Sequence, residues 1–147
     1  MKKRTSLALF MLIVFYIAGQ SFLILNIAHA QGTDSKPDCD INRAACKKIS
    51  GDTEIMFDVN PKPVKAMREL NFTVVLKGGT SPDQVFVTLV MPGMYMGENQ
   101  VVLHKASEYA YTGKGIIPKC RSGKRLWRAT VETPEGKKVD FLFSITY

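Results

Sequence analysis

After residue 50 the chain alternates apolar and polar residues, and this period of two constrains the fold more than any other feature of the sequence. The clearest alternating runs cover residues 55–59, 70–76, 85–89, 127–131 and 139–147. Glycine and proline separate the runs, and no run shows the spacing of an amphipathic helix. Each such run buries one face of a strand. The sequence therefore predicts an all-β fold, an immunoglobulin-like antiparallel β-sandwich of about seven strands.

The first thirty residues have the composition of an export segment. Lys2, Lys3 and Arg4 precede an almost uncharged apolar run, which ends in a small-x-small pattern at Ala28 and Ala30. The sequence predicts a cleaved signal peptide, with an N-terminal membrane anchor as the alternative, because about 20 apolar residues can span a bilayer. In both cases the basic residues stay inside and the rest of the chain is exported. We expect the protein in the periplasm, free or anchored to the inner membrane.

Composition divides the chain into three parts and excludes nucleic acid as a partner. Residues 1–30 form the export segment, residues 31–50 are polar without a clear period and suggest a flexible arm, and residues 51–147 form the sandwich. Residues 1–30 hold three of the 20 Lys and Arg residues and no acidic residue. The remaining 17 basic residues are dispersed among 13 acidic ones, which is too weak a positive balance to indicate nucleic-acid binding.

Three cysteines follow the export segment: Cys39, Cys46 and Cys120. In an oxidising compartment three thiols form at most one internal disulfide, so one cysteine remains free. Cys39 and Cys46 are close in sequence and can close a short loop, whereas a Cys46–Cys120 bond would tie the arm to the body. The sequence leaves both pairings open. It contains no C-x-x-C motif and so does not indicate a thioredoxin-type redox function.

The methionine loop, residues 91–97, contains three of the five methionines that follow the export segment: Met91, Met94 and Met96. Thioethers are soft ligands that select Cu(I), and they resist the oxidation that affects exported thiols. The competing interpretation is packing, because methionine fills irregular gaps in a core. Met91 also continues the inward parity of residues 85–89, which suggests that it points into the core.

His104 is the single histidine after the export segment. If Gly97 and Glu98 form the tip of a hairpin, antiparallel pairing places His104 opposite Met91, within reach of a shared metal. The competing interpretation is an ordinary surface histidine.

Short motifs in residues 53–147 resemble the YtkA-like and FixH-like exported domains. A strand leads into Met91-Pro-Gly-Met94-x-Met96-Gly, a Tyr-x-Gly segment follows at residues 111–113, and a Gly-x-x-x-Trp strand spans residues 123–127. The resemblance implies a small immunoglobulin-like sandwich behind a signal or anchor. FixH-like members are associated with the assembly of copper-containing respiratory oxidases, and related exported domains with Met/His copper sites.

The resemblance carries over Met91, Met94 and Met96 as copper ligands and Trp127 as a structural residue. This chain departs from the pattern at Cys120, where a methionine is expected, and in the Cys39/Cys46 arm. Cys120 would then supply either a thiolate ligand or a disulfide partner. The full set of candidate metal ligands is Met91, Met94, Met96, His104 and Cys120.

Basic residues crowd the segment around Cys120 and form a candidate docking patch, which consists of Lys119, Arg121, Lys124, Arg125 and Arg128. Such a patch can dock on an acidic partner or on anionic lipid headgroups. The competing interpretation is a solvated hairpin.

The sequence lacks catalytic motifs. One histidine would have to serve any Ser-His-Asp triad, and neither a Gly-x-Ser-x-Gly turn nor a His-Glu-x-x-His zinc motif is present. The prediction is a non-catalytic exported domain that binds Cu(I) and acts as a metallochaperone in the assembly of a respiratory or other cuproenzyme. Its expected partners are that cuproenzyme or its assembly factors. The alternative is a metal-free sandwich that binds a protein partner at the cell envelope.

Overall fold

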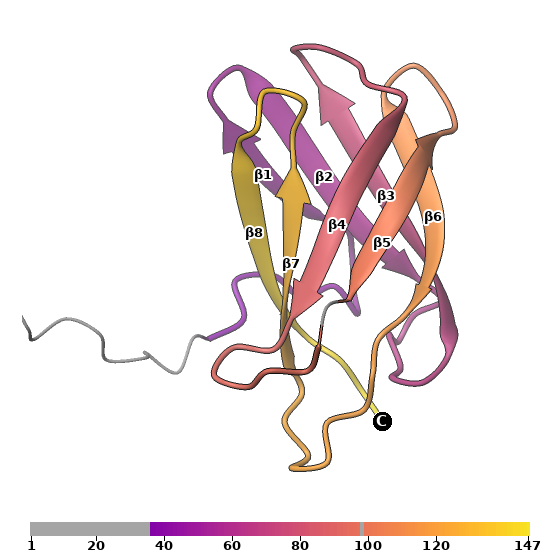
Figure 1. The fold of residues 1–147 in the computed structure, drawn as a ribbon, viewed down its shortest axis with the longest axis vertical. Coiled ribbons are helices and arrows are strands. Elements are labelled where there is room, and N and C mark those ends of the chain that lie inside the picture. The colour runs from indigo at the N-terminus through magenta and orange to yellow at the C-terminus, as the bar shows by residue number, and fades with distance from the viewer. Residues whose placement is uncertain (1–35, 98) are drawn as a thin grey trace, which may run out of the picture. The chain divides into compact units, whose positions relative to one another are not determined.

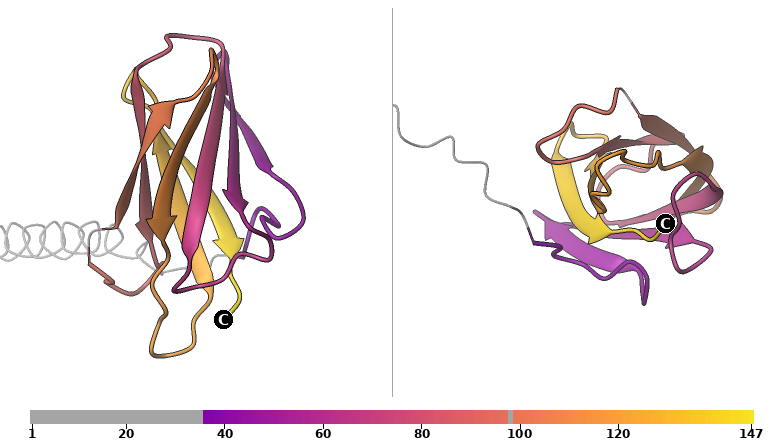
Figure 2. Two further views of the ribbon diagram at one scale, coloured as in Figure 1. Left: turned by 90° about the vertical axis from the view of Figure 1, so that its right-hand side faces the viewer. Right: turned by 90° about the horizontal axis from the view of Figure 1, so that it is seen from below.

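Eight antiparallel strands form one nearly closed, barrel-like sheet in the computed structural model, which describes residues 36–97 and 99–147 (Figures 1 and 2). The strands are β1 (Cys46–Ser50), β2 (Thr53–Asn60), β3 (Glu69–Lys77), β4 (Gln84–Val90), β5 (Gln100–Lys105), β6 (Ala110–Ile116), β7 (Leu126–Glu132) and β8 (Lys138–Ser144). Their order in the sheet is β1-β2-β3-β6-β5-β4-β7-β8. The prediction of an all-β antiparallel fold is confirmed.

The additional strand, β1, lies in the segment that the sequence suggested to be a flexible arm. It pairs with β2 through a tight turn at Gly51, which has a φ of 59°. Cys46 is its one buried residue, and Ile49 is 73% exposed. Because only one side chain of β1 is buried, the sequence shows no alternation there.

Strand β6 contains two glycines, Gly113 and Gly115, but does not end at them. It continues to Ile116 and pairs with β3 along its whole length. A Cβ atom on Gly113 would lie 2.3 Å from the Val102 carbonyl oxygen. The glycines therefore allow neighbouring backbone and side chains to approach, instead of ending the strand.

Side chains that point inward from the strands fill the interior of the barrel-like sheet. The largest fully buried ones are Trp127, Tyr111, Phe57, Phe72, Phe141 and Phe143. The Phe57 ring lies 5.4 Å from that of Phe141 and 5.8 Å from that of Phe143, measured between centroids. The buried cluster extends from Ile41 to Ile145, so residues 36–147 contain a complete core and form one compact unit.

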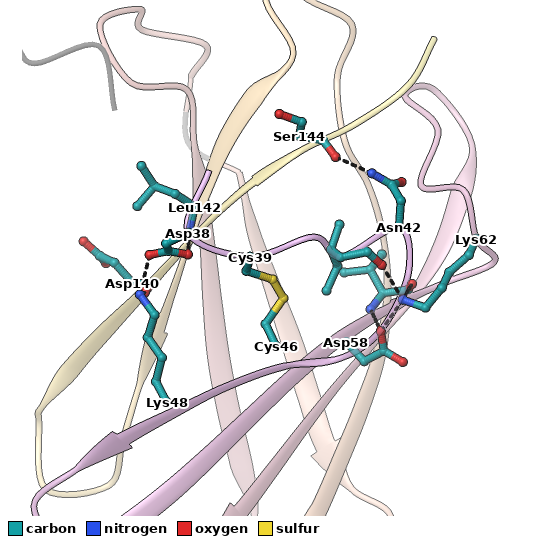
Figure 3. The surroundings of a disulfide bond; sticks show 12 residues. Asp38, Cys39, Asn42, Cys46, Lys48, Asp58, Lys62, Asp140, Leu142 and Ser144 are labelled. Atoms are coloured by element: carbon teal, nitrogen blue, oxygen red, sulfur yellow. Dashed lines mark hydrogen bonds and ion pairs between the residues drawn. A yellow bond between two sulfur atoms is a disulfide. The ribbon is translucent and has the colours of Figure 1, made fainter. Parts of the chain in front are cut away.

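The arm covers the gap between β1 and β8. The Asp38 N–H donates to the Leu142 carbonyl oxygen at 3.0 Å, and the Leu142 N–H donates to the Asp38 carboxylate at 3.0 Å. Lys48 on β1 donates to the same carboxylate and to the Asp140 carbonyl oxygen on β8 (Figure 3). These bonds bridge the two strands that do not pair with each other.

The disulfide joins Cys39 to Cys46 beside these bonds, with a Cα–Cα distance of 5.8 Å (Figure 3). Cys120 is free and buried. The expectation of one disulfide and one free cysteine is confirmed, and of the two pairings left open the structure has Cys39–Cys46.

The connections between antiparallel strands gather at two ends of the sheet (Figure 1). The upper end comprises the turns at residues 51–52, 78–83, 106–109 and 133–137. The lower end comprises the loops at residues 61–68, 91–99 and 117–125, together with residues 145–147. The methionine loop and Cys120 therefore share the lower end.

Residues 1–35, which contain the predicted signal or anchor, lie outside the described residues. Within the described part of the chain, no helix is long and apolar enough to cross a membrane.

Candidate metal site at the lower end of the sheet

The methionine loop begins with a turn that leaves its first methionine buried and its second methionine partly exposed. The Met94 N–H donates to the Met91 carbonyl oxygen at 3.1 Å, and Gly93 between them has a φ of 72°. Proline at the second position and glycine at the third produce a type II turn. Met91 is only 3% exposed, as its inward parity suggested, whereas Met94 is half-buried. The core therefore holds Met91 away from a ligand that arrives from solvent.

Cys120 lies directly against the methionine loop. Its thiol donates to the thioether of Met94, with 3.3 Å between Sγ and Sδ, although the two residues are 26 positions apart in the chain. A turn in the β6–β7 loop presents the cysteine: the Gly123 N–H donates to the Cys120 carbonyl oxygen at 3.1 Å. Two loops of the lower end thus place two soft sulfur atoms in contact.

Ser122 favours the thiolate form of Cys120. The Ser122 hydroxyl lies 3.0 Å from Sγ. Its hydrogen bond, aided by the backbone N–H groups of Ser122 and Lys124 and by the charge of Lys124, lowers the pKa of the Cys120 thiol below its ordinary value, against the opposing effect of burial. Because the thiolate is the metal ligand, this arrangement makes Cys120 a better ligand than an ordinary buried cysteine. In the sequence, the serine two positions after the cysteine is the one local signal of this arrangement.

Met96 completes the sulfur group at the surface. Met94 and Met96 both line a groove of about 370 Å³, whose other lining residues are Thr88, Val90, Tyr95, Gly97, Asn99 and Gln100. Both methionines are half-buried and pack on the edge of the core. Met94 therefore connects the buried thiol of Cys120 to a groove that is open to solvent.

His104 does not belong to this group. It pairs with Gln84 at the start of β4, whereas Met91 follows the end of β4. Seven residues of strand separate Gln84 from Met91, or about 23 Å. The predicted pairing of His104 with Met91 is wrong, because the connection between β4 and β5 is longer than a tight hairpin and shifts the register. At its own end of the sheet, His104 Nδ1 lies 3.5 Å from the Gln84 side-chain amide.

The candidate docking patch divides into two parts. Lys119, Arg121, Lys124 and Arg125 are exposed in the β6–β7 loop, and the cationic groups of Lys119 and Arg125 lie 5.1 and 5.4 Å from the centre of the Tyr147 ring. Arg128 lies instead on β7 and pairs with Asp140 of β8 at 3.7 Å. Arg128 is therefore part of the sheet surface and not of the loop.

The part of the chain that the structure describes contains no group of three or more His, Cys, Asp or Glu side chains placed to hold a metal ion. Comparisons of the chain with models of protein families, with curated proteins and with solved structures found no match. The likeness to YtkA-like and FixH-like domains stays a prediction that depends on the motifs quoted above.

Proposed function

We propose that this protein is an exported, non-catalytic domain that binds Cu(I) through Cys120, Met94 and Met96. The contact between Cys120 Sγ and Met94 Sδ, beside a groove lined by Met94 and Met96, is the observation that carries the proposal. Compared with the ligands expected from the sequence, this set leaves out Met91, which is in the core, and His104, which is at the other end of the sheet.

The chemistry of these side chains fits Cu(I). Thiolate and thioether sulfur are the soft ligands that Cu(I) prefers over harder cations. With metal–sulfur bonds of about 2.3 Å, two ligands of one ion lie about 4 Å apart. The two sulfur atoms, now 3.3 Å apart, need to separate by less than about 1 Å to accept an ion between them. One thiolate and two neutral thioethers would also balance the single charge of Cu(I).

The position of the sulfur atoms suits the transfer of copper. Cys120 is 1% exposed, so a bound ion would be shielded from solvent on one side, while the groove beside Met94 and Met96 stays accessible to ligands of a partner. Ligand exchange through such an opening supports a metallochaperone that delivers copper to a membrane-bound cuproenzyme or its assembly factors. The Cys39–Cys46 disulfide supports an exported location, because disulfides persist in oxidising compartments.

We also infer an immunoglobulin-type arrangement of the strands. In that fold, strands A-B-E-D form one sheet and C-F-G the other. If β2 to β8 are taken as A to G, the order β2-β3-β6-β5-β4-β7-β8 supports this assignment, with β1 added at one edge. The pairing of β4 with β5 makes the two sheets continuous.

An anaerobic Cu(I) titration against a competing chromophoric chelator tests the proposed function. We expect the wild-type protein to bind one equivalent. Cys120→Ser and the double substitution Met94→Leu/Met96→Leu should each weaken binding at least about tenfold, because each removes soft ligands. Met67→Leu is the matched control, since Met67 is exposed at the same end but outside the groove. Equal affinity of all four proteins would overturn the proposal.

A further inference from the structure

The three loops of the lower end carry a concentrated positive charge. Their described residues include seven basic side chains and no Asp or Glu; the basic residues are Lys62, Lys65, Arg68, Lys119, Arg121, Lys124 and Arg125. Glu98, the acidic residue of these loops, lies outside the described residues. Lys62 is paired with Asp58 at 2.6 Å, but the other six take part in none of the ion pairs within the described part of the chain.

The upper end lacks this excess of positive charge, because Lys77, Lys105 and Lys138 at its strand ends offset most of the acidic residues of its turns. Its turns contain four acidic residues, Asp52, Asp83, Glu108 and Glu135, and one basic residue, Lys137. Because antiparallel strands send alternate connections to opposite ends (Figure 1), the lower end carries the excess positive charge, and the electric field of the domain is polarised along its strands. Such a field turns the lower end toward a negatively charged surface before contact.

Lateral bonds hold the three lower loops together as one face. The Met67 N–H of the β2–β3 loop donates to the Ile117 carbonyl oxygen of the β6–β7 loop at 2.9 Å. The Asn99 side chain of the β4–β5 loop donates to the Ile116 carbonyl oxygen at 3.2 Å. These bonds join the cations of residues 65–68 to those of residues 119–125.

Large apolar side chains protrude from the same face. Met67 is 66% exposed, Tyr95 is 86% exposed and Ile116 is 51% exposed. Met67 has a φ of 59°, a left-handed conformation that is uncommon for a side chain other than glycine. Lys65 and Arg68 on either side of it line a groove of about 220 Å³ together with Pro61, Lys62, Pro63 and Leu70.

We propose that the lower end docks on a membrane surface that contains anionic lipid. The six unpaired cations match the lipid phosphates, and the groove beside Lys65 and Arg68 has room for a headgroup. Met67, Tyr95 and Ile116 insert at the boundary between headgroups and acyl chains, where tyrosine is enriched in membrane proteins. The protruding apolar side chains favour lipid over an acidic protein. This docking requires no bound copper.

Co-sedimentation of metal-free residues 31–147 with vesicles tests the proposal, since the described fold holds its complete core within this part of the chain. The vesicles contain either phosphatidylcholine alone or phosphatidylcholine with about 30% phosphatidylglycerol. We expect binding to the anionic vesicles only, with release as salt rises from about 0.05 to about 0.5 M. Free inorganic phosphate at matched ionic strength should not displace the protein.

Two triple variants with equal loss of charge locate the docking face. Arg68→Gln/Arg121→Gln/Lys124→Gln should lower the partition coefficient about 100-fold, because each cation near an anionic surface contributes about fivefold. The control, Lys105→Gln/Lys137→Gln/Lys138→Gln, removes three charges from the upper end and should change it less than about threefold. A thermal unfolding curve for each variant verifies that it folds.

Three results would overturn this proposal. The first is equal binding to both kinds of vesicle. The second is an equal loss of binding in the two triple variants. The third is failure to bind either vesicle while an immobilised acidic polypeptide retains the wild type but not the lower-end variant, which would assign the face to an acidic protein. Loss of vesicle binding with intact Cu(I) affinity would leave the proposed function standing.

Discussion

Reduction of the Cys39–Cys46 disulfide is expected to lower the stability of the whole sheet and not only that of the arm. The cysteines are seven positions apart, so the bond closes a loop of about eight residues, for which the chain-entropy relation gives about 2.5 kcal/mol. The arm fixed by this bond also supplies Asp38, which bridges β1 and β8. For a domain of this size, such a loss lowers the melting temperature by about 10 °C.

The assay is urea unfolding of residues 31–147 with and without reductant, followed by circular dichroism. A Cys120→Ser background removes the free thiol, so that reductant acts on the disulfide alone. We expect a lower unfolding midpoint after reduction, with a single cooperative transition. A change in the free energy of unfolding of less than about 0.5 kcal/mol would contradict this expectation, because the arm would then be irrelevant to closure of the sheet.

Three further predictions concern the core, the upper end and the free thiol. Gly113→Ala places a Cβ 2.3 Å from the Val102 carbonyl oxygen, so we expect chemical denaturation to show a loss of about 2 kcal/mol. A hydrogen bond from Thr80 lowers the pKa of Glu135 from 4.5 to about 2, so this carboxylate stabilises the fold fully above pH 4.5 and progressively less as the pH falls toward 2. Glu135→Gln should therefore flatten the acid dependence of stability in that window, and an unchanged curve would contradict this origin. Cys120 is 1% exposed, so its alkylation by iodoacetamide in the native protein should be at least about a hundredfold slower than in urea, and a comparable rate would show that the thiol is open to solvent.

The sequence predicts those strands in which two or more apolar side chains point into the core. The runs at residues 70–76 and 85–89 alternate because each strand buries every second side chain, and the structure confirms both as β3 and β4. It does not reveal β1, whose single buried side chain leaves no period, or the end of β6, where Gly113 and Gly115 face inward without side chains.

The candidate site could be predicted only where it depends on local spacing. The burial of Met91 follows from the parity of the preceding strand. The contact between Met94 and Cys120 depends on how two loops pack at the same end of the sheet, and a linear pattern does not contain this information. The position of His104 depends on the length of the β4–β5 connection, because a changed hairpin loop shifts the register of every later pair.

X-ray absorption at the copper edge reports the atoms bound to the metal, and it therefore tests whether sulfur alone binds the copper. For Cu(I)-loaded residues 31–147, we expect a metal coordination shell of sulfur alone, at about 2.3 Å. We expect fewer sulfur scatterers in Cys120→Ser and in Met94→Leu/Met96→Leu and an unchanged spectrum in His104→Gln. A shell dominated by nitrogen or oxygen, or one that survives both sulfur substitutions, would contradict this expectation.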